Sequence, residues 1–90
     1  MSTEVHFIEQ IVADIHQRQQ DAERNYKVFK NHWEKLNKEC ADLVNAGFVM
    51  SSPEIQDNHE NRHAAFEVMR KLDNESTACL KALDALSVLR

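Results

Sequence analysis

The sequence has little of what β architectures need at their turns, since it contains a single glycine and a single proline among its 90 residues. Aromatic residues make up only 7% of the chain. An apolar fraction of 42% with 29% charged residues is nevertheless ordinary for a folded globular chain, so the composition argues against wholesale disorder. We therefore expect one all-α domain that covers residues 1–90.

Long hydrophobic runs are also missing, because no stretch of 18 apolar residues occurs in the sequence. Residues 1–4 offer neither the cationic segment nor the apolar core of a secretory signal. We therefore expect no membrane association and a cytoplasmic location. The two cysteines, Cys40 and Cys79, fit no paired metal-ligand spacing, and in a reducing compartment they are interpreted as small buried residues.

Strong helix-ending and helix-starting signals occur in only one place, between residues 45 and 54. Gly47 suits the left-handed residue that follows a helix. Ser52 is a natural N-cap, Pro53 fits the first helical position, and Glu54 is favourable near the positive end of the helix dipole. These signals predict a helix over about 3–46, a turn over 47–52 and a helix over about 53–89.

Both segments carry apolar residues at the alternating three- and four-residue spacing of a heptad pattern. The first seam, in segment 3–46, consists of Val5, Ile8, Val12, Ile15, Gln19, Ala22, Tyr26, Phe29, Trp33, Leu36, Cys40 and Leu43. The second seam, in segment 53–89, consists of Ile55, Asn58, Arg62, Ala65, Met69, Leu72, Ser76, Cys79, Leu83 and Leu86. Folding the seams together about 47–52 predicts a long, antiparallel, coiled-coil-like helical hairpin in which Ala22 faces Ser76 and Gln19 faces Cys79.

Two helices alone enclose little volume, and further apolar residues flank both seams. A widened apolar face suits a four-helix bundle, so we expect two hairpins to form a homodimer. The alternative is a three-helix bundle, in which Asp73-Asn74-Glu75-Ser76 forms a second turn and Ser76 caps a helix over 77–89.

The string His59-Glu60-Asn61-Arg62-His63 resembles the H-E-x-x-H pattern of zinc metalloproteases over five residues. No third ligand follows at a recognised spacing, and an all-helical chain of this length offers no strand edge to hold a peptide. We expect no enzymatic activity and no cofactor. A non-catalytic metal site built from His59, His63 and Cys40 is the weaker version of this interpretation, and it would make the chain a metal-binding helical bundle.

Residues 24–38 form a basic stretch in which Lys and Arg outnumber Asp and Glu by five to one. The cations that could contact phosphates are Arg24, Lys27, Lys35 and Lys38. They project away from the seam that holds the neighbouring aromatic residues, and the whole chain carries a net charge of −4. Binding to nucleic acid, as a regulatory protein, is therefore the alternative function and not the preferred one.

One mismatch in polarity points to a binding surface near the turn. Residues 56–63 contain no apolar side chain, whereas the facing part of the first segment keeps several. Either the loop residues cover these side chains, or an apolar surface stays exposed for a partner. The candidate partner-binding residues are Leu43, Val44, Phe48, Val49, Met50, His59 and His63. We expect a small protein–protein interaction module, an adaptor, chaperone-like or inhibitor protein, that docks through its helical faces to an unidentified protein.

Overall fold

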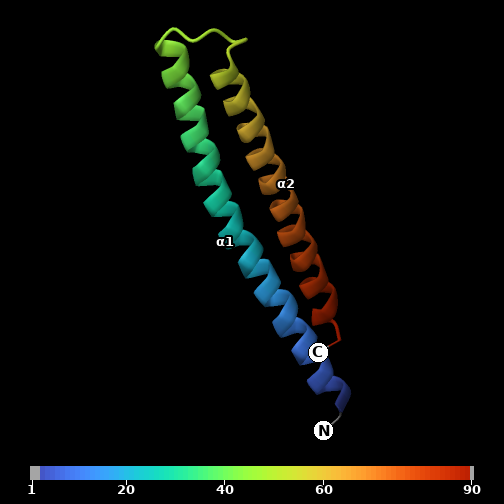
Figure 1. Cartoon of the computed structure of the whole chain (residues 1–90). Coiled ribbons are helices and arrows are strands. Elements are labelled where there is room, and N and C mark those ends of the chain that lie inside the picture. Colours follow the sequence, from blue (N-terminus) through green and yellow to red (C-terminus); the bar gives the residue numbers. More distant parts are fainter. Residues whose placement is uncertain (1–2, 90) are drawn as a thin grey trace. The chain divides into compact units, whose positions relative to one another are not determined.

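The computed structural model of the chain describes residues 3–89 and contains two long helices and no strand within that range. Helix α1 spans Thr3–Asn45 and helix α2 spans Pro53–Ser87, with residues 46–52 joining them (Figure 1). This all-helical arrangement is the one expected of a helical hairpin. Both helix starts agree with the sequence prediction, and the observed ends lie within two residues of the predicted ones.

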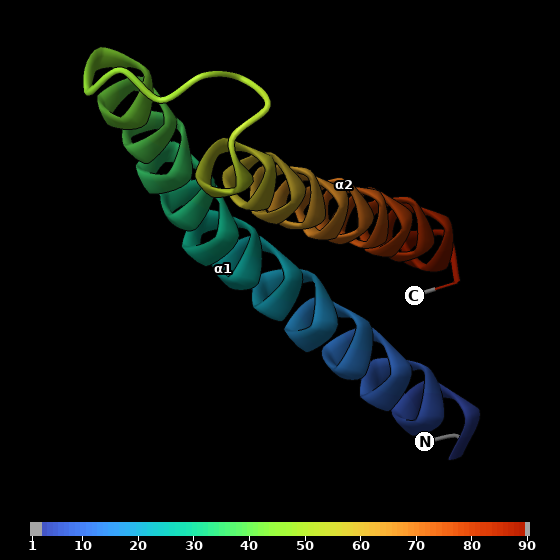
Figure 2. The ribbon, with the colours of Figure 1, turned by 45° about the horizontal axis from the view of Figure 1, so that its top comes forward.

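Helix α2 continues without a break through residues 73–76, as the rotated view in Figure 2 also shows. The alternative of a second turn at Asp73–Ser76 is therefore wrong. Ser76 occupies a seam position and is 9% exposed, so burial against α1 overrides its preference for a helix cap.

The end of α1 is a Schellman motif centred on Gly47. Gly47 has φ 96, the left-handed conformation predicted for it. The amide of Gly47 donates to the Val44 carbonyl at 3.1 Å, and the amide of Phe48 donates to the Leu43 carbonyl at 3.1 Å. These two bonds satisfy carbonyls that a helix end leaves without partners, so the chain leaves α1 in a defined direction.

The chain divides into two compact units, each containing parts of both helices. The described part of the terminal unit comprises residues 3–25 and 71–89. Its buried side chains are Gln19, Ala22, Ser76 and Cys79, and the Gln19 amide donates to the Ser76 hydroxyl at 3.4 Å. The fully buried part of this unit is therefore a mixture of small and polar side chains, with aliphatic seam residues such as Ile15, Leu72 and Leu83 half-buried beside it.

The turn unit comprises residues 26–70. Its buried apolar residues are Leu36, Ile55, Ala65 and Met69. Asn58 is buried with them at 1% exposure, and its Nδ2 donates to the main-chain carbonyl of Leu36 at 2.9 Å. A polar side chain thus fills the seam by bonding to a backbone acceptor on the facing helix.

Burial confirms both predicted seams. Every seam residue from Ile8 to Leu43 and from Ile55 to Leu86 is buried or half-buried, while Val5 lies outside the side chains that the structure describes. One hydrogen bond crosses between neighbouring layers of the seams. The partner that Ser76 bonds is Gln19, three residues along α1 from the predicted Ala22. The loop path sets the axial offset between the helices, and a heptad pattern does not encode it.

Candidate functional site: the turn-end surface

Four large apolar side chains lie exposed where α1 ends and the loop begins. Val44 is 47% exposed, Phe48 40%, Val49 64% and Met50 68%. Leu43, the other apolar residue of the predicted site, is half-buried. The loop therefore leaves these four side chains exposed in the single chain. We call Val44, Phe48, Val49 and Met50 the turn-end surface.

The loop that carries this surface is held through its backbone. The Ser52 amide donates to the Val49 carbonyl at 2.9 Å, and Gln56 Nε2 donates to the Met50 carbonyl at 2.7 Å. With the Schellman bonds at its other end, the loop backbone is tied to both helices. Its apolar side chains are thus presented from an ordered backbone, which lowers the entropic cost of docking.

Ser52 occupies the N-cap position with its backbone but not with its side chain. Its carbonyl accepts the first bond of α2, from the Gln56 amide at 3.0 Å. Its Oγ is buried and has no hydrogen-bond partner among the described residues. The side-chain cap that the sequence predicts is therefore not made, and the backbone bond from Ser52 to Val49 shapes this helix start instead.

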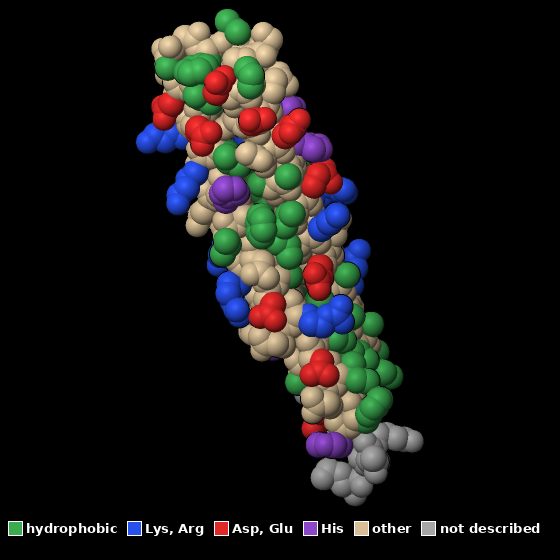
Figure 3. All heavy atoms as spheres, in the orientation of Figure 1, with side chains coloured by type: hydrophobic (Ala, Val, Ile, Leu, Met, Phe, Trp, Pro, Cys, Tyr) green, Lys and Arg blue, Asp and Glu red, His purple; other side chains and the backbone are tan. Residues whose placement is uncertain are grey.

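Acidic side chains surround the turn-end surface. Residues 39–60 contain five Asp and Glu residues and no Lys or Arg. All five are exposed, and Figure 3 shows acidic and imidazole groups beside the hydrophobic groups at this end of the turn unit. His59 and His63 are exposed as well, one turn apart on α2. The surface thus combines apolar anchors with a negative rim.

The burial of Asn58 explains most of the difference in polarity between residues 56–63 and the facing part of α1. Its side chain and that of Ile55 fill the seam opposite α1, so Leu36 is buried although the neighbouring stretch of α2 is polar. This difference pointed to the turn end of the chain. The exposed apolar residues there belong to the loop and the last turn of α1, and not to the facing seam.

The structure does not gather the candidate metal ligands into a site. His59 and His63 are exposed, and Cys40 is half-buried at a seam position of α1. Within the described part of the chain, no group of three or more His, Cys, Asp or Glu side chains is placed to hold a metal ion. Two exposed imidazoles on one helix face supply fewer ligands than a structural zinc site requires.

The four candidate nucleic-acid contacts, Arg24, Lys27, Lys35 and Lys38, are all exposed. In the terminal unit Arg24 is paired with Asp21 at 3.0 Å. Tyr26, Phe29 and Trp33 lie in the seam and are half-buried, and the rings of Trp33 and Phe66 are 6.2 Å apart. These four cations are therefore exposed, whereas the aromatic rings interleaved with them in the sequence are half-buried, unlike the exposed stacking platforms of single-strand binders.

Comparisons with protein-family models, curated proteins and solved structures find no match to this chain. Neither helix of the described range is long and apolar enough to cross a membrane.

Proposed function

We propose that this chain is a small protein–protein interaction module, of the adaptor, chaperone-like or inhibitor kind, that docks a partner protein on the turn-end surface. The observation that carries the proposal is the exposure of Phe48, Val49 and Met50 on a loop with a fixed backbone. Methionine and aromatic side chains are common anchors in protein interfaces. The loop exposes one residue of each type, Phe48 and Met50, with Val49 between them.

The acidic residues near the anchors predict the charge of the partner surface. With five exposed acids and no Lys or Arg in residues 39–60, a partner that covers the apolar anchors meets a negative field around them. We therefore expect the partner surface to carry Lys or Arg around an apolar centre, and its association to weaken as salt screens these charges.

The test compares partner capture by the full chain and by Phe48→Asp, using immobilised protein, native extract and quantitative mass spectrometry. The matched control is Leu80→Asp, which places the same charge on an exposed apolar residue of the terminal unit. Circular dichroism checks that all three proteins keep the same helix content.

The proposal expects a set of proteins that wild type and Leu80→Asp retain and that Phe48→Asp loses. Retention of these proteins should also fall at high salt. If folded Phe48→Asp captures the same proteins as wild type, the turn-end surface is not the docking site.

We also propose that the chain forms a homodimer, a four-helix bundle of two hairpins. Large apolar side chains outside the turn-end surface remain exposed on both helices, among them Phe7, Val28, Phe66 and Leu80. A second copy that covered these side chains would remove their apolar surface from water. Sedimentation or light scattering at micromolar concentration tests this proposal, and a stable 10.5 kDa monomer would contradict it.

A further inference from the structure

The turn unit carries one pair of imidazole groups on a single helix face. The chain has five histidines, and only His59 and His63 stand four residues apart. Helix α2 is continuous between them. Residues at this spacing on a helix have Cβ atoms about 5–6 Å apart, so both rings can reach one point above the helix surface. Both side chains are exposed, so this point is open to solvent.

The ring nitrogens of this pair are not used by the protein itself. Among the described residues, neither His59 nor His63 takes part in a hydrogen bond, an ion pair or a ring contact. His16, by contrast, lies 3.4 Å from the Gln20 side chain between their Nε2 atoms. The two imidazoles on α2 therefore remain available as ligands, and imidazole is the commonest metal ligand among the side chains.

The charges around the pair favour a cation. Residues 39–60 contain five exposed Asp and Glu residues and no Lys or Arg, which gives this end of the turn unit a negative potential. Arg62 directly precedes His63, but it occupies a seam position and its Nε is buried. Its side chain therefore leaves α2 on the seam side and does not lie over the imidazole pair.

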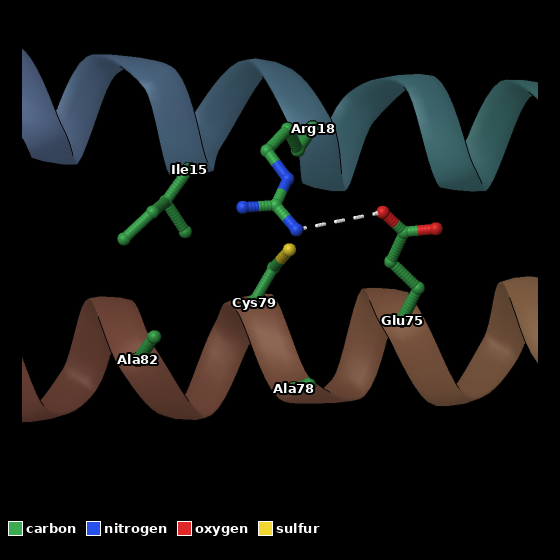
Figure 4. A pocket seen from close by; sticks show the side chains of 6 residues that line it. All are labelled: Ile15, Arg18, Glu75, Ala78, Cys79 and Ala82. Atoms are coloured by element: carbon green, nitrogen blue, oxygen red, sulfur yellow. Dashed lines mark ion pairs between the residues drawn. The ribbon is translucent and has the colours of Figure 1, made fainter.

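The two thiols offer no comparable site. Cys79 lies in a groove of the terminal unit, about 180 Å³ in volume, with Ile15, Arg18, Glu75, Ala78 and Ala82 (Figure 4). Its sulfur faces the Arg18 guanidinium group, which is also 3.9 Å from the Glu75 carboxylate. A positive charge beside both groups disfavours a metal ion there. Cys40 is half-buried and belongs to no group of three possible ligands within the described part of the chain.

We propose that His59 and His63 together bind one divalent transition-metal ion of the Zn²⁺, Cu²⁺ and Ni²⁺ class, through one ring nitrogen each, with water in the remaining coordination positions. Imidazole suits these ions, whereas Mg²⁺ and Ca²⁺ prefer oxygen ligands. Because the chain supplies two of the four ligands of a tetrahedral Zn²⁺ ion, the ion is exchangeable and is not a structural one. This inference goes beyond the proposed docking function and does not depend on it.

The first experiment titrates the full-length chain with zinc chloride in a calorimeter. We expect wild type to bind one Zn²⁺ ion per chain. Changes in the groups behind a metal ligand already cost about 10–100-fold in affinity. Removing a direct ligand in His63→Gln should therefore raise the Kd for Zn²⁺ by about tenfold or more, whereas His16→Gln, which removes a histidine outside the pair, should leave it unchanged.

The matched control exchanges two exposed residues of α2. Asn61→His combined with His63→Asn keeps the composition and the net charge of the chain, but it leaves the two imidazoles two residues apart, on different sides of the helix. Circular dichroism checks that the helix content is unchanged. The exchange should weaken Zn²⁺ binding as much as His63→Gln does. If the exchanged protein binds Zn²⁺ as tightly as wild type, the spacing of the pair has no role and the proposal is overturned.

The second experiment follows the imidazole resonances of the unmodified protein by nuclear magnetic resonance. Zinc chloride should shift the ring signals of His59 and His63 and leave those of His16 and His32 in place, and magnesium chloride should shift none of them. Equal shifts at all four rings, or no shift at His59 and His63, would contradict the site. Loss of Zn²⁺ binding in Cys40→Ser would assign the ion to the thiol and overturn the proposal as well.

Discussion

Replacing Asn58 with valine should stabilise the protein, although Asn58 is among its most buried residues. At 1% exposure, the amide makes one hydrogen bond, from Nδ2 to the Leu36 carbonyl at 2.9 Å. Its Oδ1 is buried with no hydrogen-bond partner among the described residues. The present side chain thus occupies an apolar seam with only part of its hydrogen-bonding capacity used.

The expected change in the free energy of unfolding is the sum of three contributions. Losing the bond to Leu36 costs about 1 kcal/mol, and removing a buried, unpartnered Oδ1 relieves about 1–3 kcal/mol. Burying valine in place of the amide adds about 1–2 kcal/mol from apolar contact, and the helix propensities of asparagine and valine are similar. The Leu36 carbonyl keeps its position as an acceptor within α1. Asn58→Val should therefore raise the free energy of unfolding by about 2 kcal/mol.

Urea denaturation followed by circular dichroism measures this change, with all variants at one protein concentration because the midpoint of the proposed dimer would depend on concentration. Asn58→Ala, which removes the amide without adding apolar contact, should fall between wild type and Asn58→Val. If Asn58→Val instead lowers the free energy of unfolding by more than about 1 kcal/mol, the bond to Leu36 outweighs the buried oxygen and the reasoning is refuted.

Three further predictions use the same denaturation assay. Gly47→Ala should lower the free energy of unfolding by about 1 kcal/mol, because φ 96 is a strained backbone conformation for alanine. Steric contact does not contribute, since nothing lies within 4 Å of the added Cβ. Gly47→Asn should lower the free energy of unfolding by less, because asparagine tolerates the left-handed conformation better. Phe66→Ala should cost about 1 kcal/mol through the lost ring contact with Trp33. Arg18→Ala should stay within about 0.5 kcal/mol of wild type because its ion pair with Glu75 is long and solvated, and a larger loss would show that this pair holds the terminal unit together.

The seams were predictable because burial follows the heptad spacing closely, even at polar residues. Gln19, Asn58 and Ser76 were placed in the seams by spacing alone, and all three are buried. The heptad spacing was also a better guide than the turn-forming residues before Ser76, because α2 continues through them. A pattern that repeats over many turns contains more information than one capping residue.

What the sequence could not supply was the three-dimensional path of residues 46–52 and the identity of backbone partners. The hydrogen bond from Gln19 to Ser76 was not named in advance, because the axial offset of the helices depends on the loop. Asn58 donates to the main-chain carbonyl of Leu36. Every residue has such a carbonyl, so the sequence does not indicate which one accepts this bond. Whether Phe48 and Met50 are covered depends on the same loop path, so the sequence indicated the candidate site but left its exposure open.

The most direct test of the docking surface is the free energy of unfolding of Met50→Asp. Met50 is 68% exposed, so a charge at this position should change that free energy by no more than about 0.5 kcal/mol. If Met50 instead covered the core of its own chain, the same substitution would bury a charge and cost about 2 kcal/mol or more. A change within the smaller range agrees with a surface that is free for a partner, and a loss in the larger range would contradict it.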